Sequence, residues 1–261
     1  MITRRTKGNS MDDKYIKGIK IDWSRIGENS YLRKISAVKS ITDLHFNKNI
    51  TFFVGENGTG KSTLLESIAV AYGFNAEGGN INFNFFTRDT HSELFQAITV
   101  VKGISKPKSN FFLRAESFYN VASKIEDYRD GDDYSSYYKS YGGKSMHEQS
   151  HGESFLALIQ NRFAANGLYI LDEPEAALSP QRQLTLLLLI YELSQRGTQF
   201  IIASHSPILL GVPGASVLSF DEGKIKEIAY EDTESYKVTE MFINDKDRLL
   251  RNILDSDGNL I

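Results

Sequence analysis

The chain has 261 residues, of which 41% are hydrophobic and none is cysteine, and its formal net charge is -3. This length supports one large hydrophobic core, and the absence of cysteine excludes a disulfide framework and a thiolate zinc site. The slightly acidic balance excludes a globally basic surface, and the most apolar stretch, Leu184 to Ile190, is far shorter than the ~20 residues that span a bilayer. We therefore expect a cytoplasmic protein without direct membrane insertion, with a disordered tail over residues 1–14 and one domain over 15–261.

The first predicted elements lead into a glycine-rich loop. The apolar runs at Ile35 to Val38 and Leu44 to Val54 are separated by polar turns and predict edge and central strands. Residues Gly55 to Ser62 then read Gly-Glu-Asn-Gly-Thr-Gly-Lys-Ser, and the run from Lys61 to Tyr72 predicts a helix. A strand, a loop with this spacing and a helix, in this order, are typical of a phosphate-binding loop.

The residue types in this loop match the chemistry of a triphosphate. Glycines let backbone N–H groups close around the β and γ phosphates, and the positive end of the following helix faces the same oxygens. Lys61 would add a fixed positive charge, and the Ser62 hydroxyl would complete a Mg²⁺ shell. We therefore predict that ATP with Mg²⁺ is bound by Gly55, Glu56, Asn57, Gly58, Thr59, Gly60, Lys61, Ser62 and Thr63.

The middle of the chain predicts a small helical lobe over about residues 116–162. Its segment from Asp127 to Gly143 combines tyrosines, which can stack on bases, with an excess of carboxylates, which repel phosphate. We therefore expect a mobile surface insertion over about residues 127–145 rather than a nucleic-acid site. The other elements predicted here are a loop over Gly73 to Asn84, strands over Ala97 to Val101 and Phe111 to Leu113, and a helix over Glu116 to Tyr128.

The second half of the chain alternates buried strands with helices. Short apolar runs bounded by glycine or acidic residues are typical of buried parallel strands, and this alternation predicts an α/β fold. The predicted elements are helices over Glu153 to Phe163, Pro180 to Gln195 and Glu234 to Leu254, strands over Leu168 to Leu171 and Phe200 to Ala203, and a hairpin of Val217 to Phe220 with Ile225 to Tyr230.

Two carboxylates directly follow the predicted strand Leu168 to Leu171. The carboxyl ends of parallel strands are where α/β sheets bind their ligands, so both would lie beside the phosphate loop. We expect Asp172 to hold Mg²⁺, directly or through water. We expect Glu173 to orient and deprotonate a water molecule that attacks the γ-phosphorus. Glu175 is instead typical of a residue that caps the helix beginning at Pro180.

A histidine stands at the end of the next predicted strand, in Ser204-His205-Ser206-Pro207. A histidine beside a serine is more often a local hydrogen-bonding residue than a functional one. The position of His205 behind a phosphate loop and an acidic strand end nevertheless favours a γ-phosphate sensor with a catalytic role.

Ser150 and Gly152 precede the predicted helix that begins at Glu153. Ser150 and Glu153 form a capping box, which is one sufficient explanation for them. A serine and a glycine at an exposed helix N-terminus also form a receptor for a γ-phosphate. Because the phosphate loop already holds the nucleotide of its own subunit, this receptor would serve a second copy, in a head-to-tail homodimer around two ATP molecules.

The whole series of motifs resembles the ATP-binding-cassette ATPase superfamily over about residues 30–230. The resemblance rests on the phosphate loop, Ser150-His151-Gly152, the acidic strand end, the turn Ala176 to Ser179 and His205. The form Asp-Glu-Pro-Glu resembles the soluble branch that includes RecF and structural-maintenance-of-chromosomes proteins, and several phrases are similar to small uncharacterised bacterial ATPases. The resemblance implies a P-loop NTPase fold with an ABC-type core sheet, an N-terminal antiparallel β portion and a small helical lobe.

Two positions depart from the pattern of that superfamily. Its glutamine that links Mg²⁺ to the helical lobe has no match, because Ala115 or Glu116 stands there, and Glu116 is a candidate to bind Mg²⁺ through water. His151 stands where the superfamily usually has glycine. The grip on the nucleotide of the partner subunit is therefore expected to differ.

The leading functional hypothesis is an ATP hydrolase that dimerises in its ATP state and switches a separate protein effector, with DNA repair or genome defence as candidate settings and DNA as a candidate partner. One alternative is the nucleotide-binding subunit of a membrane transporter. Another is a module that senses ATP with little hydrolysis. Phosphate release that is lost in Glu173→Gln would separate the enzyme from the sensor.

Overall fold

The computed structural model describes residues 14–81, 92–115, 118 and 151–253. Its central sheet has six strands, of which five are parallel and the last, β9, runs antiparallel to β8. Every residue of β3, β6 and β7 is buried, as expected for parallel strands that are covered on both faces. In spatial order the strands are β5 (Ser109–Arg114), β6 (Gly167–Asp172), β7 (Gln199–Ala203), β3 (Ile50–Val54), β8 (Ser216–Ser219) and β9 (Lys226–Ile228).

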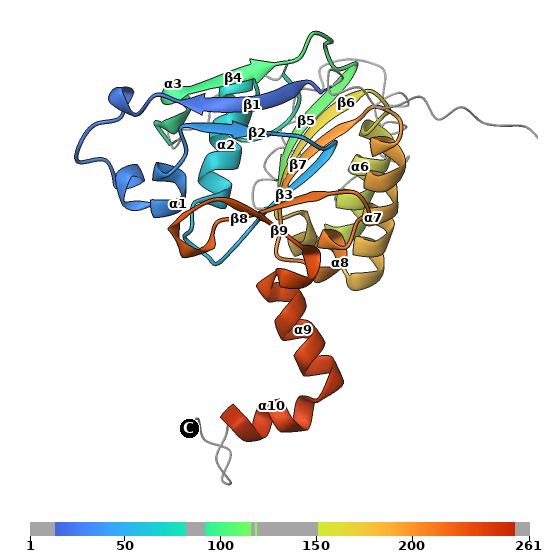
Figure 1. Cartoon of the computed structure of the whole chain (residues 1–261). Helices are drawn as coiled ribbons and strands as arrows, with labels where there is room; N and C mark the ends of the chain where they lie inside the picture. The colour runs from blue at the N-terminus through green and yellow to red at the C-terminus, as the bar shows by residue number, and fades with distance from the viewer. Residues whose placement is uncertain (1–13, 82–91, 116–117, 119–150, 254–261) are drawn as a thin grey trace, which may run out of the picture.

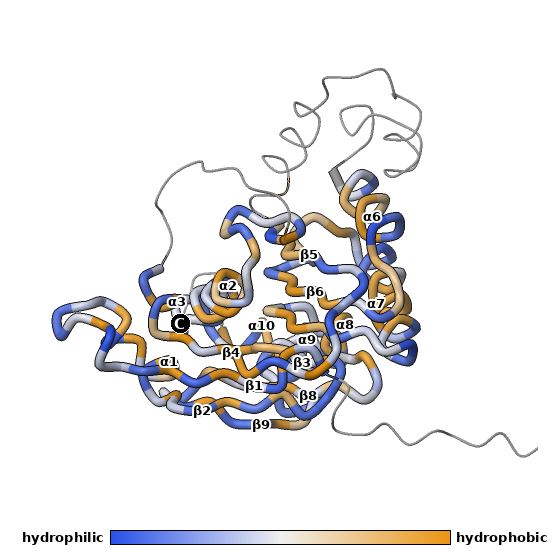
Figure 2. The backbone as a smooth tube through the Cα atoms, turned by 90° about the horizontal axis from the view of Figure 1, so that it is seen from above, coloured by the Kyte–Doolittle hydropathy of each residue, from blue (hydrophilic) through white to orange (hydrophobic). Residues whose placement is uncertain are grey.

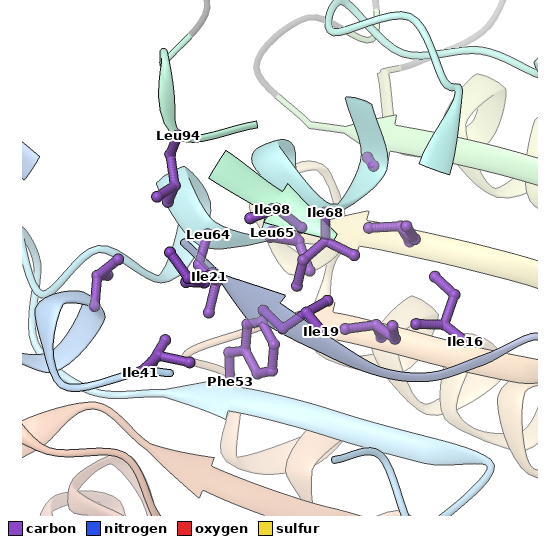
Figure 3. Packing of buried hydrophobic residues seen from close by; sticks show 14 of the residues in the cluster. Ile16, Ile19, Ile21, Ile41, Phe53, Leu64, Leu65, Ile68, Leu94 and Ile98 are labelled. Atoms are coloured by element: carbon purple, nitrogen blue, oxygen red, sulfur yellow. The ribbon is translucent and has the colours of Figure 1, made fainter. Parts of the chain in front are cut away.

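A second, three-stranded antiparallel sheet has β1 (Ile16–Ile21) between β2 (Asp43–His45) and β4 (Ile98–Lys102). Helix α2 (Lys61–Tyr72) packs between this sheet and the central one. Figure 3 shows the core that results, in which Leu64, Leu65 and Ile68 of α2 lie among Ile19 of β1 and Phe53 of β3. The helix that follows the phosphate loop is thus held by hydrophobic packing on two sides.

The other face of the central sheet is covered by α6 (His151–Arg162) and α7 (Pro180–Ser194). Seen from above, β5 and β6 lie between α2 on one side and these two helices on the other (Figure 2). The second core includes a stack of Phe163 on Tyr169, whose ring centroids are 3.9 Å apart. The two cores on opposite faces make the three-layer α/β arrangement that the motifs imply.

The remaining described elements are short, apart from two helices at the end of the chain, α9 (Glu234–Asn244) and α10 (Lys246–Ile253). These two project away from the body in Figure 1. Among the described residues, no helix combines the length and the apolar character that crossing a bilayer takes. The short elements are α1 (Ser36–Lys39), α3 (Leu94–Ala97), α8 (Pro207–Leu210), and 3-10 turns at Trp23–Arg25, Tyr31–Lys34, Pro174–Ala177, Asp221–Gly223 and Tyr230–Asp232.

The predicted helix over residues 61–72 is confirmed to the residue, and the predicted α/β fold with an antiparallel N-terminal portion is confirmed. The predicted strand over residues 35–38 is wrong. Ile35 links a 3-10 turn to α1, which contains the other three residues, because the apolar side chains of Ile35 and Val38 pack beneath the phosphate loop instead of extending a sheet edge. The predicted C-terminal helix is broken at Asp245, whose φ of -150° and ψ of 64° are not helical. The expected insertion over 127–145 lies outside the described residues.

Candidate functional site

The phosphate loop connects the end of β3 to the start of α2. Three of its glycines have positive φ, namely 138° at Gly55, 82° at Gly58 and 94° at Gly60. A side chain is strained in this region of backbone space, and a Cβ at Gly60 would also stand 2.5 Å from Val38 Cγ2. The loop can therefore take this shape only with glycine, and it rests directly on α1.

Lys61 is held inside the loop and is only 4% exposed. Its Nζ donates hydrogen bonds to the carbonyl oxygens of Gly55, at 2.7 Å, and Glu56, at 2.8 Å. Burial lowers the pKa of Lys61, although the negative charges of nearby carboxylates, with Glu173 the largest, oppose the shift. A cavity of about 270 Å³ opens beside it, lined by Ile35, Asn57, Gly58, Gly60, Lys61, Ser62, Thr63 and Glu173.

Ser62, which lines this cavity, is hydrogen-bonded to Asp172 behind it. The Ser62 hydroxyl donates to Asp172 Oδ1 at 2.9 Å. Burial raises the pKa of Asp172 to about 6, against the Ser62 hydrogen bond and the Arg114 charge, which both lower it. A hydroxyl and a carboxylate beside a phosphate cradle are the oxygen donors that Mg²⁺ takes when it also binds phosphate. The donors present therefore fit the predicted cation.

Arg114 is a residue that sequence reasoning missed. It ends β5 directly opposite Asp172 in the strand register. Its Nη1 lies 2.6 Å from Glu66 Oε2, and its Nε lies 3.5 Å from Asp172 Oδ2. A cation directly after the predicted strand Phe111 to Leu113, and just before the position of the missing glutamine, was the signal that could have found it. Arg114 balances two carboxylates next to the candidate metal site.

Glu173 and His205 face each other across a wider cavity of about 550 Å³ that they line with Glu56 and Asn57. Glu173 Oε1 and His205 Nε2 are 3.9 Å apart. Glu173 takes the left-handed conformation, with φ 49° and ψ 50°, which is costly for a residue with a side chain and is found at functional sites. Burial, helped by the Lys61 charge, lowers the pKa of His205, which keeps the imidazole neutral at neutral pH. Within the described part of the chain, its Nε2 has no hydrogen-bond partner.

Glu175 does not cap the helix at Pro180, contrary to expectation. Its Oε1 accepts a hydrogen bond from the backbone N–H of His205 at 2.6 Å. Ser179 is the N-cap residue of α7 and makes no side-chain capping bond. Burial raises the pKa of Glu175. Because the carboxylate holds the His205 backbone, Glu175 positions the candidate sensor rather than a helix end.

Asp221 is a second residue that the sequence did not single out. Its Oδ1 accepts from the backbone N–H of Glu56 at 3.0 Å, and its Oδ2 accepts from the Ser219 hydroxyl at 2.9 Å. The first turn of the phosphate loop is thereby tied to the end of β8. A cavity of about 840 Å³ lies alongside, between the phosphate loop, residues 34–37, the turn from β8 to β9 and the start of α9.

The remaining predicted residues are placed only in part. Glu116 and Ser150 lie outside the described residues. Gly152, in the first turn of α6, lies against the turn after Asp172 of the same chain, since a Cβ on it would stand 2.7 Å from Ala177 O. Gly152 does not line the cavity that holds Lys61 and Ser62. The structure thus brings together Lys61, Ser62, Asp172, Glu173 and His205, but not Gly152.

Two family models match the chain. The family described as "AAA domain" matches residues 31–162, and the family described as "AAA domain, putative AbiEii toxin, Type IV TA system" matches residues 138–211. The chain matches no curated protein. Together the two matched ranges include the phosphate loop, Asp172, Glu173 and His205.

Several solved structures are similar to the chain. A chain of "an inward-facing conformation of a putative metal-chelate type ABC transporter" has a TM-score of 0.49 and 16% identity, over 87% of this chain and 88% of that one. The protein cbiO1 from Clostridium perfringens, part of the ABC transporter complex cbiONQ, has a TM-score of 0.46 and 16% identity, over 88% and 95%. The SMC head domain from Thermotoga maritima has a TM-score of 0.43 and 13% identity, over 82% and 98%.

Proposed function

We propose that this chain, which belongs to the family of AAA-domain ATPases, hydrolyses Mg·ATP. The ATP cycle closes and opens a homodimer, and the homodimer switches a separate protein effector. The observation that carries the proposal is that Lys61, Ser62 and Glu173 line one cavity while Asp172 is hydrogen-bonded to Ser62. A phosphate-binding loop alone would fit a kinase or a motor as well. A second carboxylate directly after the candidate metal ligand adds a group that can act on water.

The proposed reaction transfers the γ-phosphoryl group of ATP to water. The loop backbone and Lys61 bind the β and γ phosphates, while Ser62 and Asp172 would hold Mg²⁺, which supplies charge neutralisation on those phosphates when bound. Glu173 orients a water molecule and accepts its proton as the water oxygen bonds to the γ-phosphorus. The bond from that phosphorus to the β–γ bridging oxygen breaks, and ADP and phosphate leave.

His205 is proposed to contact the γ-phosphate through Nε2. This atom is buried and has no hydrogen-bond partner among the described residues, so it is available to a ligand. A neutral imidazole can donate from Nε2 when its proton is on that nitrogen. Glu175 supports this role because it fixes the backbone of His205.

The proposed dimer is head to tail, with Ser150 and Gly152 of one copy completing the ATP site of the other. Support comes from the placement of Gly152, which lies against Ala177 of its own chain and does not line the cavity that holds Lys61. A receptor at the start of α6 therefore needs a phosphate from elsewhere. Two such composite sites related by a two-fold axis would form one closed dimer.

We place the effector in genome defence rather than DNA repair. The support is the match of residues 138–211 to a family whose description names a toxin of a type IV toxin–antitoxin system. The overall charge of -3 offers no broad basic surface for DNA, so a protein effector is the better fit to the composition.

The dimer is tested with Glu173→Gln, which should bind ATP but hydrolyse it slowly and so accumulate the closed state. On a sizing column with light scattering, this variant should elute as a dimer with excess Mg·ATP and as a smaller species with ADP. The matched control is Glu175→Gln, which removes a neighbouring carboxylate that is not assigned to water. A Glu173→Gln protein that stays monomeric with saturating ATP would rule out the sandwich.

A further inference from the structure

Helices α9 and α10, residues 234–253, form an arm that stands clear of the body (Figure 1). None of the residues of α9 is buried. The chain turns at Asp245 between the two helices, so α10 lies across the far end of α9. A helix with no buried residue gains little stability from packing against its own chain, although such packing supplies most of the stability of helices in proteins. The arm therefore offers a surface that another molecule can cover.

Several large apolar side chains of the arm are exposed. Val238, Met241 and Phe242 are spaced so that they share one side of α9, and each is between 44% and 49% exposed. Ile243, at 74%, and Ile253, at 41%, add to the exposed apolar area of the arm. Single exposed hydrophobic residues are common, but a contiguous group marks an interaction site. Its apolar character indicates a protein surface rather than nucleic acid.

The base of the arm is fixed beside the nucleotide site. The Tyr230 hydroxyl donates to the backbone oxygen of Pro207 at 2.8 Å, two residues beyond His205. The rings of Tyr230 and Tyr236 meet with centroids 4.8 Å apart, which anchors the first turn of α9. The start of α9 also lines the 840 Å³ cavity together with the phosphate loop. The arm therefore rises from the edge of the molecule that binds the nucleotide.

The charges of α10 complement that same edge, although the whole arm carries four acidic and four basic side chains. α10 carries the cations Lys246, Arg248 and Arg251 against the single anion Asp247. The edge around the phosphate loop carries the acidic side chains of Glu56, Glu173, Asp221 and Glu222, together with lysines, of which Lys226 pairs with Glu222 at 2.9 Å. The arm points away from this edge in its own chain, so the complementary surface is available on a second copy.

We propose that the arm packs against a second copy of this chain when two copies close around ATP. The proposal rests on the proposed function, because it uses the head-to-tail dimer. The stripe Val238, Met241 and Phe242 of one copy packs against the second copy and becomes buried there. In the same contact, α10 lies beside the acidic edge of the second copy. The two-fold axis makes the contact twice. Through Tyr230, each arm is joined to the segment that carries His205, so closing on ATP and arm docking favour each other.

The test uses Glu173→Gln as the background, with saturating Mg·ATP, and measures the dimer dissociation constant by analytical ultracentrifugation. Adding Met241→Asp and Phe242→Asp should raise that constant at least about 10-fold while the binding of a fluorescent ATP analogue is unchanged. Reversing the charges of α10 with Arg248→Glu and Arg251→Glu should also raise the dimer dissociation constant, and the size of this increase should depend on the salt concentration. The matched control is Leu188→Asp on α7, where Leu188 is 60% exposed, and the dimer should persist.

The outcomes separate the two proposals. If Glu173→Gln dimerises with ATP and both arm variants dimerise equally well, the arm contact is overturned while the sandwich stands. If Glu173→Gln itself never dimerises, the sandwich and the arm contact both fall. Unchanged circular dichroism and nucleotide binding show that the variants are folded, so a weakened dimer reports the contact itself.

Discussion

The hydroxyl of Ser62 donates a hydrogen bond to Asp172 Oδ1 at 2.9 Å, although the two residues are 110 positions apart in the chain. Ser62 belongs to the first turn of α2, and Asp172 ends β6. The bond therefore joins the helix that follows the phosphate loop to the strand that carries the acidic pair. It is the structural basis for treating these two oxygens as one cation site.

Ser62→Ala and Asp172→Asn should each weaken Mg²⁺-dependent ATP binding about 10-fold or more, because each removes one oxygen donor of the site. The double variant should lose less ATP-binding free energy than the sum of the losses in the two single variants, since the side chains are in direct contact. Titration calorimetry with ATP at several Mg²⁺ concentrations measures this. Ser67→Ala is the control, because Ser67 lies on the same helix and bonds only to the backbone of Thr63 in the described structure. Strictly additive losses would contradict a shared site.

Gly60→Ala should abolish ATP binding and destabilise the protein. The new Cβ would be forced to φ 94° and would stand 2.5 Å from Val38 Cγ2, so the loop must shift. Gly73→Ala is the matched control, because Gly73 has φ 123° at the other end of α2 and no atom within 4 Å of a new Cβ. Denaturant unfolding should show about 1 to 2 kcal/mol lost in the control from backbone strain alone, with ATP binding kept. Equal ATP binding in the two variants would show that the loop does not rest on Val38 as described.

Glu175→Ala should lower ATP turnover and lose about 1 to 3 kcal/mol of stability, because the backbone N–H of His205 loses its buried partner. Glu175→Gln should restore most of both, since an amide oxygen can accept the same hydrogen bond. Steady-state phosphate release and thermal unfolding of the three proteins give the comparison. If Glu175→Gln lowers turnover and stability as much as Glu175→Ala does, Glu175 acts through its charge and not by positioning His205.

Arg114→Gln should lower the free energy of unfolding by about 2 to 4 kcal/mol, because it leaves Glu66 and Asp172 together in a largely buried place without their cation. The comparison is Arg182→Gln, which breaks the more exposed pair with Glu153 and should cost at most about 1 kcal/mol. Urea unfolding without Mg²⁺ measures both. Similar losses for the two variants would mean that Arg114 does not compensate the carboxylates.

The strands and helices nearest the site were predictable because local pattern decides them. The run of residues 61–72 is bounded by a phosphate loop and by Gly73, and the helix occupies those residues. The strand over Ile16–Ile21 was missed, since Gly18 and a register shift between Ile16 and Gly18 interrupt the alternation of isoleucine and lysine, and its partners lie far along the chain. The run Ile35 to Val38 has a strand-like composition, but its environment is the underside of the phosphate loop, which no local pattern reveals.

The site residues fall into the same two groups, those that a local motif predicts and those that only the strand order brings together. Lys61, Ser62, Asp172 and Glu173 belong to motifs in which spacing along the chain reports the chemistry. The contacts of Asp221 and Arg114 depend instead on strand order: Asp221 bonds a backbone N–H 165 positions away, and Arg114 meets Asp172 only because β5 pairs with β6. The link from Glu175 to His205 likewise crosses from the end of β6 to the end of β7. Such pairs follow from the sheet and not from spacing.

The central claim is that Glu173 activates water for ATP hydrolysis. The most direct measurement is phosphate release at saturating Mg·ATP by the wild-type protein and by Glu173→Gln, with ATP binding measured on the same samples. The account predicts steady release by the wild type and a loss of about 100-fold or more in the variant, with ATP binding retained. Phosphate release by Glu173→Gln at the wild-type rate, or none from the wild type while it binds ATP, would contradict it.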